Sequence, residues 1–193
     1  FILGYCGRAL DAAGRLPDHT VVATVMSNLG LERFLERHDI ALTRTKVGDR
    51  YVLERMLEGG YALGGEQSGH VIFQDVAPTG DGIATGLRLA TLWKSGAGDL
   101  DQTQAEMPRY PQVLVNVKVR EKPEIEDHPV LAEAVRAAVE EMGGDGRVVV
   151  RYSGTEPKAR VMIEGPEEIL VRRMADDLAA GFRAEIGLDP DGP

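Results

Sequence analysis

The first half of the chain alternates short apolar runs with stretches in which apolar residues recur every three or four positions. Residues 20–25 form a β-branched apolar run, which is typical of a buried parallel strand, and residues 41–47 predict the next strand. Helical spacing predicts helices over residues 9–14, after Asn28, over 49–58 and over 82–94, and residues 61–63 and 71–73 bracket a polar turn. Strands that alternate with helices in this way predict an α/β domain with a mainly parallel sheet.

Polar residues and glycines mark where these helices begin and end. Ser27 and Asn28 predict the N-cap of the second helix, and Asp81 predicts the start of the helix over 82–94. The glycine pair at 59–60 predicts the end of the third helix. Within the helix over 82–94, we expect the buried side to consist of Ile83, Leu87, Leu89, Ala90 and Trp93.

The pattern changes after residue 95. Residues 95–110 are polar and have few apolar anchors, which predicts a linker. Beyond it, strands are predicted over 112–119, 148–150 and 161–163, and helices over 129–142 and 166–186. This order predicts a smaller α+β domain with an antiparallel sheet and helices on one face. We therefore expect domains over residues 1–100 and 108–187, and a disordered tail over 187–193.

Charge and composition exclude several classes of protein. The formal net charge of -9 argues against a general nucleic-acid binder, because such affinity depends on positive fields. No apolar run approaches the roughly 18 residues that span a bilayer. A lone cysteine, Cys6, rules out an internal disulfide and fits a buried role in a reducing compartment, so we expect the cytoplasm. The chain opens on Phe1 without a methionine, which indicates a fragment that starts inside a domain.

The densest group of hydrogen-bond donors is RYSGTEPKAR over residues 151–160, between two predicted strands. A Ser-Gly-Thr turn offers two hydroxyls and closely approaching backbone N–H groups, and the arginines add forked, permanently charged donors. The alternative is an ordinary hairpin turn with solvated charges, and composition alone does not decide between them. The predicted phosphate ligands are Arg151, Ser153, Gly154, Thr155 and Arg160.

A second candidate site is GGEQSGH over residues 64–70, in which glycines let the backbone turn tightly. Adjacent hydroxyls of a pyranose need an acceptor such as Glu66 beside a group such as Ser68 that donates or accepts. His70 is a candidate acid or base. The alternative is a glycine-rich hairpin whose polar groups satisfy one another.

The two loops together are more specific than either one. The sequence GEQSGH, followed further along by RxSGTEP, resembles the α-D-phosphohexomutase family. Residues 24–32, 46–51, 79–83 and 111–117 resemble its phosphoglucosamine mutase branch, which Gln67 also favours. The resemblance runs from about Gly4 to Gly181. Tyr152 and Lys158 depart from the usual phosphate loop, where proline and a neutral or apolar residue are common.

The resemblance implies four domains around a cleft, of which this chain covers most of the third and the whole fourth. It implies a reversible phosphoryl shift between the 6- and 1-positions of glucosamine phosphate, through a phosphoserine enzyme and glucosamine 1,6-bisphosphate. Glu66 and Ser68 would hold ring hydroxyls, and the loop of Arg151 would hold the phosphate that is not transferred. Lys46 and His70 are implied candidates for steadying charge or moving protons, with an ion pair or a hinge contact as the alternative.

The family's reactive serine and its Asp-x-Asp metal loop belong to segments upstream of where this chain starts. We therefore expect no metal ligand and no mutase activity in this chain alone, and Mg²⁺ as the cofactor of the intact enzyme. The expected partner is a small sugar phosphate, not nucleic acid or a membrane. A strand missing from the first domain would expose a sheet edge, so a homodimer is a further expectation. The alternatives are a phosphomannomutase or phosphoglucomutase, or a non-catalytic module that binds sugar phosphates.

Overall fold

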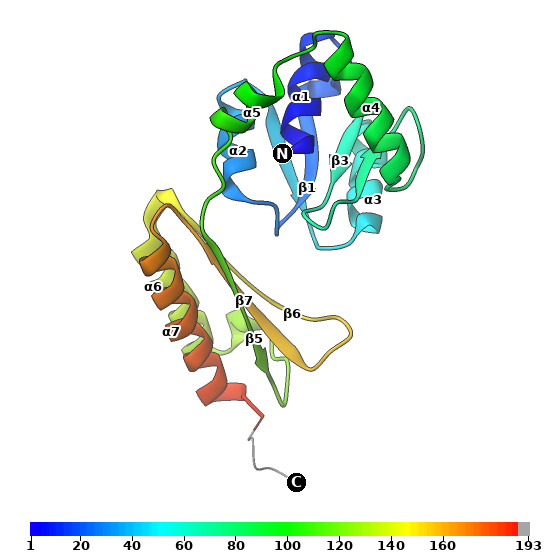
Figure 1. Ribbon diagram of the computed structural model, residues 1–193. Coiled ribbons are helices and arrows are strands. Elements are labelled where there is room, and N and C mark those ends of the chain that lie inside the picture. Colours follow the sequence, from blue (N-terminus) through cyan, green and yellow to red (C-terminus); the bar gives the residue numbers. More distant parts are fainter. Residues whose placement is uncertain (189–193) are drawn as a thin grey trace. The chain divides into compact units, whose positions relative to one another are not determined.

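The computed structural model describes residues 1–188 of the chain (Figure 1). These residues form two compact units, one of Phe1–Arg109 and one that begins at Tyr110. The buried apolar clusters of the two units are separate, so each unit has a core of its own. None of the helices found within residues 1–188 is long and apolar enough to cross a bilayer.

The first unit alternates helices with strands. Its strands are β1 (Thr20–Thr24), β2 (Ala41–Thr45), β3 (Leu63–Gly65) and β4 (Val71–Phe73). Its helices are α1 (Ile2–Ala12), α2 (Leu29–Glu36), α3 (Asp49–Gly59), α4 (Gly82–Lys94) and α5 (Leu100–Glu106), with a short 3-10 turn, η1 (Pro17–His19), before β1. The side chains of Asn28 and Asp81 accept hydrogen bonds from the N–H groups of Gly30 and Ala84, which confirms both predicted N-caps.

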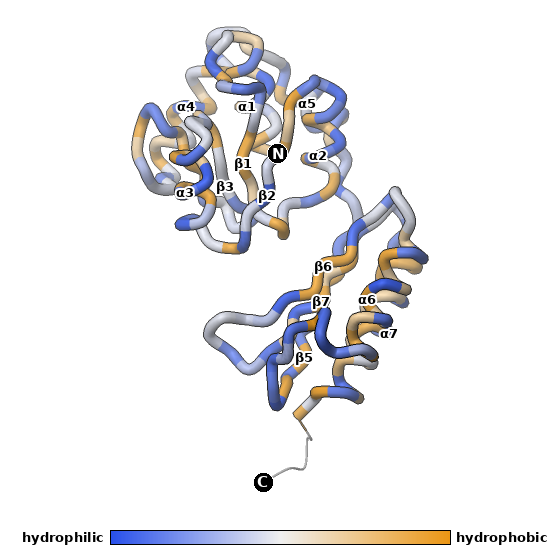
Figure 2. Tube along the Cα trace, turned by 180° about the vertical axis from the view of Figure 1, so that it is seen from behind, coloured by the Kyte–Doolittle hydropathy of each residue, from blue (hydrophilic) through white to orange (hydrophobic). Residues whose placement is uncertain are grey.

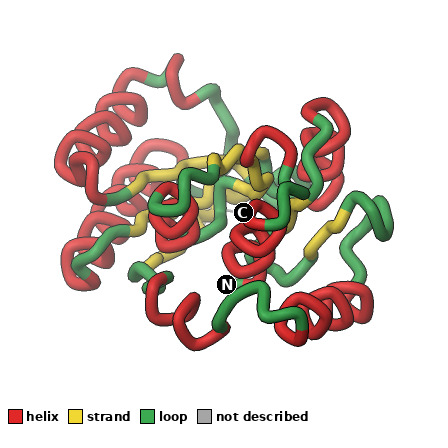
Figure 3. The backbone as a smooth tube through the Cα atoms, turned by 90° about the horizontal axis from the view of Figure 1, so that it is seen from above, coloured by secondary structure: helices red, strands yellow, loops and turns green. Residues whose placement is uncertain are grey.

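These strands form one sheet in the order β2-β1-β3-β4. β1 pairs in parallel with β2 and β3, whereas β4 runs antiparallel to β3. Val21 and Ala23 enter an apolar cluster shared with α1 and α2, while Val22 enters the cluster of Val52 and Met56 on α3. Successive residues of a strand point to opposite faces of the sheet. α1 and α2 therefore pack on one face and α3 on the other, so that helices cover both faces (Figure 3). The predicted α/β fold with a mainly parallel sheet is confirmed.

The first helix is longer than the sequence pattern suggests. α1 begins at Ile2 rather than at residue 9. Leu3, Tyr5 and Cys6 are buried in the same cluster as Leu10, so the whole segment contributes one apolar face to the core. The run at the start of the chain is therefore a core helix.

The stretch expected to be a linker contains α5. Asp99 caps this helix, because its carboxylate accepts from the N–H groups of Asp101 and Gln102. Nη2 of Arg8 donates to Oγ1 of Thr103 over 2.9 Å, which ties α5 to α1. The linker prediction is wrong over these residues, because polar contacts and the packing of Leu100 and Met107 against the core hold this segment in place.

The predicted buried side of α4 is also wrong. Thr85 and Leu92 are its buried residues, and Leu89 packs against the core as expected. Ile83, Leu87 and Trp93 are 79%, 66% and 61% exposed, and Ala90 is exposed as well. The apolar residues of α4 lie on more than one face, so their spacing alone does not identify the face that packs.

The second unit combines an antiparallel sheet with two long helices. Its elements are β5 (Gln112–Lys118), α6 (Pro129–Met142), β6 (Arg147–Tyr152), β7 (Lys158–Glu164) and α7 (Glu168–Ile186), with 3-10 turns η2 (Ile125–Asp127) and η3 (Gly143–Asp145). The strand order is β5-β7-β6, and both pairings are antiparallel. Val161 and Ile163 of β7 share a core with Phe182 and Ile186 of α7, and Figure 2 shows the apolar positions in orange. The predicted smaller α+β domain is confirmed.

A buried carboxylate connects the three strands of the second unit. Glu164 is 0% exposed and is the register partner of both Gln112 on β5 and Arg147 on β6. Its carboxylate accepts from Nη2 of Arg147 over 2.5 Å and from Nε2 of Gln112 over 2.9 Å. Because a buried charge without partners is strongly destabilising, this rung favours the observed register.

Most of the predicted disordered tail, residues 187–193, lies outside the described residues. Its first residues are ordered, which the prediction missed. Gly187 forms an antiparallel bridge with Val119, and the N–H of Leu188 donates to the carbonyl of Lys118 over 3.1 Å. The chain following α7 therefore pairs with the end of β5.

Candidate functional site

The loop between β3 and β4, residues 66–70, is a tight turn. The N–H of Glu66 donates to the carbonyl of His70 over 2.8 Å, and the N–H of Gly69 donates to the carbonyl of Glu66 over 3.1 Å. Gly69 has a φ of +99°, a conformation that residues with side chains rarely adopt. The turn thus holds the predicted sugar ligands Glu66 and Ser68 on one short segment with His70.

Protein groups satisfy part of the hydrogen-bonding capacity of this loop. Oγ of Ser68 and Nδ1 of His70 share a hydrogen bond of 3.0 Å. The N–H of Gly48 donates to Oε2 of Glu66 over 3.2 Å, which joins the loop to the start of α3. These contacts agree with the alternative of a self-satisfied hairpin. Ser68 and His70 are nevertheless exposed, and a carboxylate accepts several further bonds, so the loop retains capacity for a ligand.

Lys46 follows β2 and is exposed. The carboxyl ends of β1, β2 and β3 meet at one edge of the sheet because these strands are parallel, and ligands of open α/β sheets bind at that edge. Lys46 lies two residues before Gly48, the residue that contacts Glu66. The structure therefore places Lys46 and Glu66 on loops at the same edge of the sheet.

A cleft of about 750 Å³ lies next to the β3–β4 loop within the first unit. Glu66, Gln67 and Gly69 line it, together with Ser27 and Asn28, which follow β1. The rest of its lining is largely apolar with one basic residue, and includes Leu3, Leu31, Val71, Met107 and Arg109. Ser27 and Asn28 were not among the predicted site residues, although their position shortly after a parallel strand was a usable signal.

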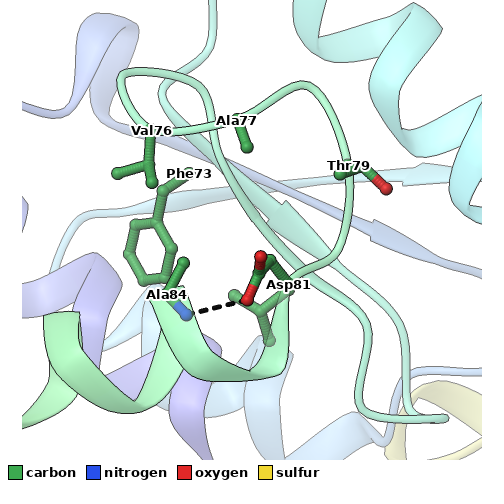
Figure 4. A pocket seen from close by; sticks show the side chains of 7 residues that line it. Phe73, Val76, Ala77, Thr79, Asp81 and Ala84 are labelled. Carbon is green, nitrogen blue, oxygen red and sulfur yellow. Dashed lines mark hydrogen bonds between the residues drawn. The ribbon is translucent and has the colours of Figure 1, made fainter.

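The loop after β4 forms no comparable cavity. In Figure 4, Val76 and Ala84 lie beside Phe73, and the space that they border with Ala77, Thr79 and Asp81 leaves no free volume for a ligand. Oδ1 of Asp81 accepts from the N–H of Ala84 over 2.9 Å. Asp81 is therefore a helix cap, as predicted.

The β6–β7 hairpin carries the predicted phosphate loop, and Ser153 fixes its shape. The N–H of Ser153 donates to the carbonyl of Lys158 over 2.8 Å, and its Oγ accepts from the N–H of Glu156 over 3.3 Å. Nζ of Lys122 donates to the carbonyl of Ser153 over 2.6 Å. Ser153 is only 4% exposed, whereas Gly154 and Thr155 are exposed. Ser153 thus shapes the loop, and its two neighbours present groups to the outside.

Arg151 and Arg160 provide the charge of this loop. They are register partners across the β6–β7 ladder, and the Nε atom of each is buried without a hydrogen-bond partner in the described part of the chain. Burial, and secondly the charge of Arg160, lower the pKa of Arg151. An anion beside the pair would supply the opposite charge, so the pair is suited to bind one.

The residues that depart from the usual phosphate loop leave this pair in place. Tyr152 packs against the core of the second unit, and burial raises the pKa of its hydroxyl. Nζ of Lys158 donates to Oε1 of Glu156 over 2.5 Å, and Nη2 of Arg160 donates to Oε2 of Glu156 over 3.2 Å. Hydrogen bonding to Lys158, followed by the charges of Lys158 and Arg160, lowers the pKa of Glu156.

The described residues do not fit a magnesium site. Within residues 1–188, no group of three His, Cys, Asp or Glu side chains is placed to hold a metal ion. The acidic residues near the two loops instead accept hydrogen bonds from backbone or basic groups, as Glu66, Asp81 and Glu156 do.

The fold is that of phosphohexomutase structures. N-acetylphosphoglucosamine mutase of Aspergillus fumigatus matches 95% of this chain and 42% of its own chain, with a TM-score of 0.77 at 18% identity. The chain belongs to the phosphoglucomutase/phosphomannomutase family: the profile of its alpha/beta/alpha domain III matches residues 1–110, and that of its C-terminal domain matches residues 114–181.

Curated relatives carry the name of the branch that the sequence resembles. Phosphoglucosamine mutase of Solibacter usitatus is 52% identical over 186 residues, which cover 96% of this chain and 42% of that protein. Phosphoglucosamine mutase of Brevibacillus brevis is 48% identical over 180 residues, which cover 91% of this chain and 40% of that protein. The chain therefore spans about two fifths of the length of these relatives.

Proposed function

We propose that this chain is the C-terminal part of a phosphoglucosamine mutase, an enzyme that interconverts glucosamine 6-phosphate and glucosamine 1-phosphate. In this proposal the β6–β7 loop binds the phosphate that is not transferred, and the β3–β4 loop binds hydroxyls of the sugar. The intact enzyme works through a phosphoserine and glucosamine 1,6-bisphosphate.

The observation that carries the proposal is the arginine pair of the second unit. Arg151 and Arg160 are held side by side next to the exposed Gly154 and Thr155, and their buried Nε atoms have no hydrogen-bond partner within residues 1–188. Each hydrogen bond between such a cation and a phosphate oxygen contributes roughly 1.5–3 kcal/mol. A loop of this kind recognises phosphate and little of the sugar, so it accepts the phosphate of either monophosphate.

The β3–β4 loop supplies recognition of the sugar. Glu66 accepts from hydroxyls and Ser68 donates or accepts, which suits neighbouring groups on a pyranose ring. His70 has Nδ1 bonded to Ser68, which leaves Nε2 to hold or move a proton at the sugar. Lys46, at the same edge of the sheet, steadies negative charge in this proposal.

The chemical step depends on residues outside this chain. Phosphoryl transfer needs a nucleophile and usually a divalent cation that neutralises developing charge. A structure of the Aspergillus fumigatus relative is described as a complex with GlcNAc-6P and magnesium. We propose that the remainder of a longer protein supplies the reactive serine and the Mg²⁺ ligands, and that this chain alone binds sugar phosphate weakly without turnover.

A coupled assay with glucosamine 6-phosphate tests this proposal. The purified chain is expected to give no product above background, while a longer protein that contains it is expected to be active. Normal turnover by the chain itself would contradict the proposal. Comparing glucosamine, mannose and glucose phosphates on the longer protein separates this branch from phosphomannomutase and phosphoglucomutase, and inactivity with all three favours a binding module.

A homodimer and a cytoplasmic location complete the proposal. The sheet of the first unit ends in β2 and β4, and strands at a sheet edge are prone to pair with another chain. The buried thiol of Cys6 suits a reducing compartment. Sedimentation equilibrium tests the dimer.

A further inference from the structure

The phosphate loop contains a carboxylate of its own. Glu156, at the tip of the hairpin, accepts from Nζ of Lys158 over 2.5 Å and from Nη2 of Arg160 over 3.2 Å. The side chains of Lys158 and Arg160 are 31% and 29% exposed, so both cations are partly desolvated. A negative group thus already bonds one of the predicted phosphate ligands, Arg160, together with the neighbouring Lys158.

Arg160 is only partly used by this contact. Its Nη2 atom bonds Glu156, while its Nε atom is buried and has no partner within residues 1–188. The Nε atom of Arg151, its register partner, is likewise unpartnered. A phosphate that approaches the arginine pair therefore meets a cation, Arg160, that the carboxylate of Glu156 already engages in part.

We propose that Glu156 is a competing anion that keeps the phosphate affinity of this loop low. It holds Lys158 and one edge of Arg160 while the loop is empty, and a phosphate takes over these donors on binding. The inference rests on the proposed function of the loop. Two anions close together repel each other, so each bound phosphate displaces or strains the Glu156 contacts.

The protonation state of Glu156 agrees with this role. Hydrogen bonds and charges of Lys158 and Arg160 hold its pKa below the ordinary value, so the carboxylate is ionised at neutral pH. Weak retention suits a mutase, because a bisphosphorylated sugar has to leave the loop and rebind with its other phosphate in place. Interactions that hold every bound form equally do not raise the rate of turnover.

A titration of the chain with inorganic phosphate tests the inference, with the backbone amide signals of Gly154 and Thr155 as the readout. Glu156→Gln keeps the shape and the hydrogen-bonding ability of the side chain but removes its charge. Glu168→Gln is the matched control, because Glu168 is a carboxylate of the same unit that pairs with Arg172 on α7 over 3.5 Å. Exposed ion pairs of this kind are weak, so we expect Kd to fall about two- to fivefold in Glu156→Gln and to stay unchanged in Glu168→Gln.

Equal Kd values for Glu156→Gln and Glu168→Gln would overturn the inference, as would weaker binding by Glu156→Gln alone. Arg151→Ala separates this failure from failure of the proposed function. If Arg151→Ala loses phosphate binding while Glu156→Gln matches the control, the loop binds phosphate and only the role of Glu156 is wrong. If Arg151→Ala binds phosphate as the unmodified chain does, the proposed function of the loop fails as well.

Discussion

Arg151 and Arg160 are register partners in the β6–β7 ladder, which places two like charges side by side on a partly buried surface. Like charges opposite each other destabilise a sheet, and burial together with this neighbour lowers the pKa of Arg151. Repulsion between the two arginines therefore destabilises the ligand-free chain, and a bound anion offsets this repulsion. A ligand that binds only the folded state also stabilises it by mass action.

The carboxylate of Glu66 is expected to select the sugar. Glu66→Gln keeps an oxygen that accepts from the N–H of Gly48 but loses the charge that strengthens bonds to ring hydroxyls. We expect the affinity for glucosamine 6-phosphate to fall several-fold, by about 1 kcal/mol, with unchanged affinity for inorganic phosphate. Calorimetry with both ligands measures the two effects. Equal losses for the two ligands would count against this role.

Lys122 is expected to support the phosphate loop through the carbonyl of Ser153, which its Nζ atom contacts over 2.6 Å. Lys122→Met removes this hydrogen bond, so we expect inorganic phosphate to bind a few-fold more weakly, by about 1 kcal/mol. Lys122→Arg restores a donor and is expected to recover most of the affinity. Equal binding by the methionine variant and the unmodified chain would show that the contact does not position the loop.

The buried rung of Glu164, Arg147 and Gln112 is expected to matter for stability. Glu164→Ala leaves Arg147 without its buried carboxylate, and breaking such a pair costs about 3–5 kcal/mol of unfolding free energy. Glu168→Ala, on the exposed start of α7, is expected to change stability by less than about 0.5 kcal/mol. Urea denaturation compares the two variants. A similar, small change for both would contradict the importance of the rung.

Cys6 is expected to make stability depend on alkaline pH. Burial raises the pKa of its thiol from 9.0 to about 12. Above pH 9.0 the unfolded chain releases this proton while the folded chain keeps it, so the contribution to stability is lost as pH rises toward about 12. Urea denaturation across this range is expected to show a shallower decline for Cys6→Ala. Parallel curves for the two proteins would contradict the burial effect.

Local sequence features predicted much of the fold. The β-branched run at 20–25 became β1, and Asn28 and Asp81 became helix caps, because strand propensity and capping depend on neighbouring residues. The packed face of α4 depends on the core that it meets, and α5 is tied to α1 by Arg8 and Thr103, which are 95 positions apart. Such contacts are not visible in the periodicity of one segment.

The same distinction holds for the candidate site. The glycine-rich turn of Glu66 and the basic hairpin of Arg151 are contiguous motifs, so the sequence predicted both. The contact from Lys122 to Ser153 spans 31 positions and was not predicted. The bridge from Glu156 to Lys158 and Arg160 is local, but its geometry depends on how the hairpin closes.

Calorimetric titration of the chain with glucosamine 6-phosphate tests most directly whether the β6–β7 loop binds phosphate. Loss of one charged hydrogen-bonding group is expected to cost about 1.5–3 kcal/mol, so Arg151→Ala should bind roughly ten- to a hundredfold more weakly. Arg172→Ala, an exposed change on α7, is the matched control and should bind as the unmodified chain does. Unchanged affinity in Arg151→Ala, with its fold intact by circular dichroism, would contradict the claim that the β6–β7 loop binds phosphate.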